Sequence, residues 1–185
     1  EMFPTYIDAG AVEDMSSYVT DEDKKEYKYL SNGNMMDGQY GWPLVTGVPF
    51  VLYYNEDILN ALGEKAPETW DDFARICQEA TKDTDGDGKV DQYGFACGMN
   101  TSDIGAMQIL NAYYYSALWQ NGGQVYNDDL KSVSFADEAG KEAVTWLKGL
   151  TSYMNEDFMS LSWSDAFSNV FGAGKEAFGI TRSSQ

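Results

Sequence analysis

Aspartates stand at places 1, 3, 5 and 9 of the segment 83–91, Asp-Thr-Asp-Gly-Asp-Gly-Lys-Val-Asp, and a glycine, Gly88, stands at its sixth place. Ca²⁺ is a hard cation that takes six to eight oxygen ligands, and a loop with acids at alternate places can wrap around one. The predicted calcium ligands are the side chains of Asp83, Asp85, Asp87 and Asp91 and the carbonyl group of Lys89.

Calcium-binding loops of the EF-hand type have a glycine at the sixth place, where it allows the backbone to turn sharply around the ion. The loop lacks the ligand that usually closes the site. Its twelfth place is Gly94, where an EF-hand loop has a bidentate glutamate, and Gln92 is the predicted substitute. The missing glutamate favours a structural calcium ion over a calcium sensor. The alternative is a solvated acidic turn that holds no metal.

The composition excludes several classes of function. The net charge is −18 with only 12 Lys and Arg, so no basic face is available for nucleic acid, and an anionic membrane surface is disfavoured. The absence of histidine removes His-based zinc sites and Ser-His-Asp triads. No apolar run approaches the roughly 20 residues that span a bilayer, so this segment is not expected to insert into a membrane. A leader could have preceded Glu1, because the chain begins within a helical pattern.

The hydrophobic content of 43% is enough for a sizeable core. Cys77 lies on an apolar helix face and Cys97 ends a strand, so both are expected to be buried free thiols. A disulfide is the alternative, and it requires Cα atoms within about 7 Å of each other.

Strands alternate with helices along the chain, and this order predicts an α/β fold with a mostly parallel sheet covered on both faces. Strands are predicted at 48–55, 93–97 and 176–181, with short ones at 124–126 and 132–135. Helices are predicted at 1–9, 20–30, 56–62, 69–80, 102–120, 137–154 and 162–171.

Helical spacing also predicts which side chains face the core. In the helix at 102–120 the inward stripe is expected to be Ile104, Met107, Leu110, Tyr114 and Leu118. Three tryptophans on apolar helix stripes are expected in the core: Trp70, Trp119 and Trp146.

Four segments resemble, in the right order, motifs of the sugar-type extracellular solute-binding proteins of ABC transporters, family 1, which are maltose-binding-protein-like. The first joins Tyr-Gly-Trp-Pro-Leu at 40–44 to the strand and helix start at 51–59. The second is Pro-Glu-Thr-Trp-Asp-Asp-Phe at 67–73. The others are Leu-Trp-Gln-Asn-Gly-Gly at 118–123 and Phe-Gly-Ala-Gly-Lys-Glu-Ala-Phe at 171–178, which has Phe178 where methionine is usual.

This resemblance implies a type II periplasmic-binding-protein-like fold, in which two lobes close on a solute by hinge motion. It implies a carbohydrate ligand, delivery to the permease subunits of an ABC importer, and a location outside the cell membrane, either periplasmic or as a cell-surface lipoprotein. A monomer is expected. The family is longer at both ends, so the chain is interpreted as a fragment. Residues 1–48 would end the N-terminal lobe and approach the hinge, 49–178 would form part of the C-terminal lobe, and 179–185 would return toward the cleft.

In open α/β sheets, ligands bind beyond the carboxyl ends of the strands. This rule selects the segments 98–103 and 181–184, and the hinge segment 42–48 adds a third approach. Sugars are held by aromatic stacking and by side-chain hydrogen bonds. The candidates are Trp42 and Trp163 for stacking, with Thr46, Asn100, Ser102, Asp103 and Arg182 as polar partners.

Each candidate has a structural alternative. Trp42 could pack at the hinge and Trp163 in the core, Asp103 could cap a helix, and Arg182 could pair with an acid. The competing functions are a calcium-stabilised glycan-processing enzyme with two carboxylates and a calcium-dependent interaction module. No nucleophile elbow, phosphate loop or metalloprotease motif is present, so no catalysis is expected.

Overall fold

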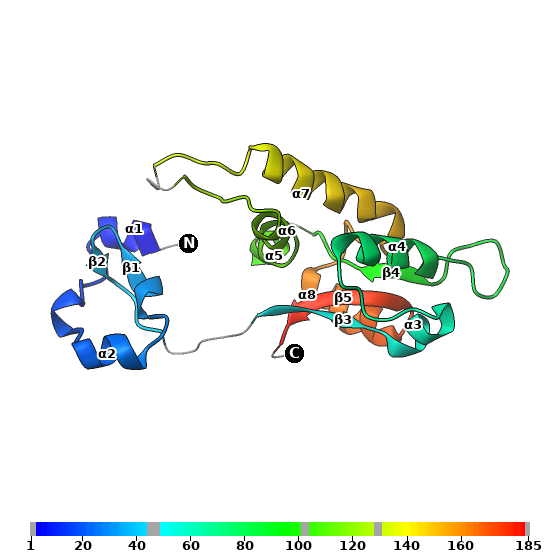
Figure 1. The fold of residues 1–185 in the computed structure, drawn as a ribbon, viewed down its shortest axis with the longest axis horizontal. Coiled ribbons are helices and arrows are strands. Elements are labelled where there is room, and N and C mark those ends of the chain that lie inside the picture. The colour runs from blue at the N-terminus through cyan, green and yellow to red at the C-terminus, as the bar shows by residue number, and fades with distance from the viewer. Residues whose placement is uncertain (1–2, 44–48, 101–103, 128–130, 184–185) are drawn as a thin grey trace. The chain divides into compact units, whose positions relative to one another are not determined.

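The computed structural model describes residues 3–43, 49–100, 104–127 and 131–183 of the chain. The chain divides into two compact units, Glu1–Val48 and Pro49–Gln185, which Figure 1 shows as ribbons. None of the described helices is long and apolar enough to cross a bilayer.

The first unit is built from short elements. Its helices are α1 (Phe3–Asp8) and α2 (Asp21–Glu26), and its hairpin pairs β1 (Asn34–Met35) with β2 (Gly38–Gln39). The N-terminus of α2 is capped, because Asp23 donates its backbone N–H to Thr20 Oγ1 and Thr20 donates its own to the Asp23 carboxylate. The helix ends at Glu26 and not near residue 30 as predicted. It buries no residue, so no packing extends it beyond the capped turn.

The second unit has a three-stranded sheet in the order β3-β5-β4. The strands are β3 (Phe50–Tyr54), β4 (Tyr93–Ala96) and β5 (Glu176–Arg182). The α/β class is confirmed, but the sheet is mixed and not mostly parallel, since β5 pairs parallel with β4 and antiparallel with β3. Alternation of strands and helices predicts crossovers, but it does not fix the direction in which the first strand enters the sheet.

Helices pack around this sheet, and several begin at residues whose side chains cap them. Thr69 Oγ1 accepts the backbone N–H of Asp72, and Ser162 Oγ accepts that of Asp165. The predicted strands at 124–126 and 132–135 are reduced to one bridge between Tyr126 and Val133. The helices are α3 (Glu56–Leu62), α4 (Trp70–Ala80), α5 (Ile104–Ile109), α6 (Tyr115–Gln120), α7 (Glu138–Gly149) and α8 (Trp163–Asp165).

The core centres on Phe73 of α4. Its ring lies 4.9 Å from that of Phe178 and 5.4 Å from that of Phe95, measured between centroids. Trp70 and Trp146 are partly buried against this cluster, as predicted. The thiols Cys77 and Cys97 are both buried and free, which confirms that prediction.

The helix from Ile104 to Gln120 turns a different face inward from the one predicted. Residues Leu110–Tyr114 are π-helical, and a π-turn adds a residue and rotates the following side chains. Within this turn Tyr113 is buried where Tyr114 was predicted, and before and at its start Met107 and Leu110 are each 41% exposed. Leu118 is buried as predicted, but Trp119 is 56% exposed, so its assignment to the core is wrong.

Candidate ligand-binding site

Three aromatic and cationic side chains meet at the end of β5. Phe50 and Arg182 are register partners across the β3–β5 ladder. The Arg182 guanidinium lies 5.8 Å from the ring centroid of Phe50 and 5.9 Å from that of Trp163. The two rings contact each other edge to face, with centroids 5.7 Å apart. The structure thus brings together two of the predicted site residues, Trp163 and Arg182, and adds Phe50, which no motif in the sequence indicated.

A fourth side chain fixes the position of the arginine. Arg182 Nη2 donates a hydrogen bond of 2.9 Å to Gln108 Oε1, which comes from α5. Sequence reasoning missed Gln108, although an amide in the otherwise apolar stretch Ile104–Leu110 was a signal for it. Because Gln108 is neutral, it orients the guanidinium without balancing its charge.

Trp163 is positioned by the capped turn that opens α8. Its side chain is 6% exposed and belongs to the main core. The alternative that Trp163 packs in the core is therefore correct for most of the ring. Its indole N–H is also buried, and no described residue accepts a hydrogen bond from it. The indole N–H is therefore an unused hydrogen-bond donor at this end of the sheet. A buried donor without an acceptor lowers the free energy of unfolding by about 1–3 kcal/mol.

Asn100 lies beside the same turn. Its backbone N–H donates to the Leu161 carbonyl at 2.9 Å, and its Nδ2 donates to the Ser160 carbonyl at 3.0 Å. The chain after β4 therefore runs along the segment that leads into Trp163. Two of the three predicted segments, those following β4 and β5, approach the same turn.

The remaining sugar-site candidates fall elsewhere. Thr46, Ser102 and Asp103 lie outside the described residues. Trp42 belongs to the first unit, where its ring contacts Tyr27 edge to face at 5.3 Å. It also lines an open hollow of about 710 Å³ within that unit.

A cavity of about 290 Å³ adjoins the arginine site. Phe50 belongs to both, because it lines the cavity and contacts Arg182. Its lining combines apolar side chains of the sheet and of α4 with hydroxyl, amide and carboxylate groups. The lining includes Leu52, Ile180, Trp70, Thr69, Ser116 and Gln120.

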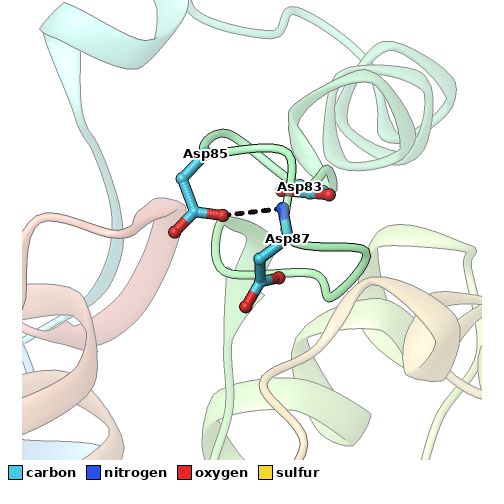
Figure 2. Close-up of side chains that lie close together, drawn as sticks. All are labelled: Asp83, Asp85 and Asp87. Carbon is cyan, nitrogen blue, oxygen red and sulfur yellow. Dashed lines mark hydrogen bonds between the residues drawn. The ribbon is translucent and has the colours of Figure 1, made fainter.

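The acidic loop gathers three of its four aspartates. The carboxylates of Asp83, Asp85 and Asp87 each place an oxygen within 4.8 Å of the others. Figure 2 shows these side chains on one turn, where Asp85 accepts the backbone N–H of Asp87. Gly86 and Gly88 have φ values of +81° and +90°, a backbone conformation that favours glycine.

Two further predicted ligands make hydrogen bonds with other parts of the protein. Asp91 accepts hydrogen bonds from the backbone N–H and the hydroxyl of Thr84, and Gln92 donates its side-chain N–H to the Ala80 carbonyl. Lys89 donates its backbone N–H to Asp87.

The loop backbone favours ionised aspartates. Hydrogen bonds from the N–H groups of Gly88 and Gly86 lower the pKa of Asp83. The hydroxyl and N–H of Thr84 lower the pKa of Asp91. Three carboxylates that lie this close together offer the oxygen ligands that a hard divalent cation takes, so the residues fit calcium.

Comparison with known proteins decides the family. The family model for bacterial extracellular solute-binding proteins matches residues 1–185. The chain belongs to the bacterial extracellular solute-binding protein family. The matched family and its solved neighbours are solute-binding proteins and not enzymes, in agreement with the expectation of no catalysis.

Relatives of this solute-binding protein are about twice its length. A putative binding protein of Brucella abortus is 28% identical over 189 residues, which cover 95% of this chain and 41% of that protein. A solute-binding protein of Thermotoga lettingae bound with α-D-tagatose aligns with a TM-score of 0.69 at 18% identity, over 97% of this chain and 45% of the other. The maltose/maltodextrin-binding domain of Bdellovibrio bacteriovorus, bound to maltotriose, gives 0.70 at 15% identity, over 96% and 43%. These structures confirm the type II fold, and this chain spans less than half of each.

Proposed function

We propose that the full-length protein binds a carbohydrate at the sheet edge formed by Phe50, Trp163 and Arg182, and delivers it to the permease of an ABC importer. The observation that carries the proposal is the position of Arg182 over two aromatic rings at the carboxyl end of β5. Membership of the solute-binding family supports it, as do the tagatose and maltotriose bound to the structural neighbours. On this proposal the protein works outside the cell membrane, in the periplasm or as a surface lipoprotein.

The chemistry of the site suits a sugar. Aromatic rings bury the apolar C–H face of a sugar, and guanidinium N–H groups donate to its hydroxyls. Phe50 and Trp163 would supply the apolar contacts and Arg182 the donors, and Trp42 is proposed as a further stacking residue. Thr46, Asn100, Ser102 and Asp103 are proposed as further polar partners.

Calorimetry on the full-length protein tests this proposal. A panel of neutral and acidic oligosaccharides is titrated into the parent and into Arg182→Gln, Trp163→Phe and Trp42→Ala. We expect each substitution to weaken binding by about 1–3 kcal/mol, the scale of losing buried aromatic area or a charged hydrogen bond. Trp119→Phe is the control, because that side chain is 56% exposed on α6. Parental affinity in all three variants would place the site elsewhere, and no binding of any sugar would reject the function.

Delivery to a permease has a separate test. Cells that lack the gene should lose uptake of the sugar identified by calorimetry, and the parent gene should restore it. Restoration by the Arg182→Gln variant at low sugar concentration would contradict the assigned site.

We also propose that the acidic loop binds a structural calcium ion through Asp83, Asp85 and Asp87. The support is their carboxylate oxygens within 4.8 Å of one another. Asp91, the Lys89 carbonyl and Gln92 are proposed to complete the ligand set. The ion would fix the turn between α4 and β4 by neutralising the mutual repulsion of the carboxylates.

Thermal unfolding with and without calcium tests this second proposal. Calcium should raise the melting temperature of the parent, because a ligand that binds only the native state stabilises it. Asp85→Asn should remove most of that rise, whereas Asp8→Asn, at the exposed end of α1, should keep it. An equal melting temperature in calcium and in chelator would reject the calcium site.

A further inference from the structure

The two arginines of the chain have opposite surroundings. Arg75 is 2.7 Å from Glu64 and 2.9 Å from Glu79, so carboxylates balance its charge. Arg182 is partly buried, and within the described residues no carboxylate lies within ion-pair distance of it. Its partners are the neutral amide of Gln108 and two aromatic rings.

The lack of a carboxylate beside Arg182 among the described residues is unexpected, because the chain carries 30 Asp and Glu against 12 Lys and Arg. A partly buried cation loses part of its hydration, and a carboxylate is the usual partner that compensates. At Arg182 the protein supplies an amide in that place. The amide occupies one N–H of a group that has five, so donors remain for another molecule.

We propose that Arg182 recognises an anionic saccharide, one that carries a carboxylate in the manner of a uronic acid. This inference rests on the proposed carbohydrate function and names the class of sugar. A carboxylate is planar and matches the guanidinium fork with two parallel hydrogen bonds. The buried N–H of Trp163, which has no acceptor among the described residues, is a further donor beside the same group.

Gln108 is the positioning residue in this arrangement. Its oxygen holds the guanidinium in place and leaves the positive charge available to the ligand. The net charge of −18 does not cancel this local attraction, because charges beyond about 8–10 Å are largely screened at physiological salt.

The test compares acidic and neutral sugars on the full-length protein. Digalacturonate, diglucuronate and dimannuronate are each titrated beside the neutral disaccharide that has a hydroxymethyl group in place of the carboxylate. We expect the best acidic ligand to bind at least tenfold more tightly than its neutral partner. Arg182→Gln should reduce that ratio at least tenfold.

Gln108→Glu is the decisive variant. This substitution keeps the shape of the side chain but places a carboxylate against Arg182. The affinity for the acidic sugar should therefore fall at least tenfold. The affinity for its neutral partner should change less than threefold. Gln78→Glu, on the exposed surface of α4, adds the same charge and should leave the ratio unchanged. Thermal unfolding of each variant shows that it is folded.

The possible outcomes separate the two proposals. A neutral sugar as the tightest ligand, or an acidic preference that survives Gln108→Glu, would overturn the anionic ligand and leave the carbohydrate function standing. Failure of both sugar classes to bind would overturn both.

Discussion

The backbone of Gly94 in β4 lies directly against the backbone of Cys77 in α4. A Cβ atom at Gly94 would collide with the carbonyl oxygen and the Cα of Cys77. Gly94 is also the twelfth place of the acidic loop, where an EF-hand has its glutamate. The close contact between helix and strand therefore explains why the loop lacks that ligand: no side chain fits there.

Replacement of Gly94 by alanine should destabilise the fold. The colliding atoms are backbone and cannot turn away, so we expect a loss of about 1–3 kcal/mol in the free energy of unfolding, as for other overpacked cores. Denaturant titration measures it. Gly149→Ala is the control, because it has open space and helical dihedral angles and should be neutral or slightly stabilising. Equal stability of the parent and Gly94→Ala would contradict the packing argument.

Glu176 should make stability depend on pH. The residue is 3% exposed, and one carboxylate oxygen has no hydrogen-bond partner among the described residues. Burial raises its pKa from 4.5 to about 7; Asp157 adds to the rise, and Lys175 opposes it. The native state then keeps a proton that the unfolded state releases, so the free energy of unfolding should fall as pH rises from about 4.5 to about 7.

Denaturant titrations of the parent and Glu176→Gln at several pH values measure this effect. The variant carries no titrating group there, so it should lack the decline. The difference between the two should grow toward pH 8 and reach the order of 1–3 kcal/mol. Parallel profiles for the two proteins would show that Glu176 is ionised in the native state.

The two thiols should resist chemical labelling in the native protein. Burial raises the pKa of Cys77, and it raises that of Cys97 to about 12, so little reactive thiolate forms near neutral pH. A thiol reagent should therefore label neither residue quickly until denaturant is added, and then label both. Rapid labelling of the native protein would show that the helix and strand open more readily than their burial indicates.

The face of the helix that precedes α6 can be tested with a pair of tyrosines. Tyr113 is 3% exposed with its ring 5.6 Å from that of Phe95, whereas Tyr114 is partly exposed and donates its hydroxyl to the Phe135 carbonyl. Tyr113→Ala should cost about 3–5 kcal/mol in the free energy of unfolding, and Tyr114→Ala less than half as much. The reverse order would favour a regular α-helix over the π-turn.

The sequence by itself determined the local features and the family. Helices are capped by the hydroxyl groups of Thr20, Thr69 and Ser162. Such a hydroxyl accepts a hydrogen bond from an N–H two or three residues later, so the residues involved are neighbours in the sequence. The motifs at 40–59, 67–73, 118–123 and 171–178 indicated the solute-binding family for the same reason, since each is a short segment.

Only the tertiary structure decided the features that join distant residues. Tyr113 is buried in place of Tyr114 within the π-turn at Leu110–Tyr114, and a prediction from the regular helical period does not include such a turn. The direction of β3 depends on its pairing with β5, more than a hundred residues later in the chain. The contact of Gln108 with Arg182 spans 74 residues and arises only when α5 packs beside the end of β5, because no local pattern links an amide on a helix to a cation on a strand.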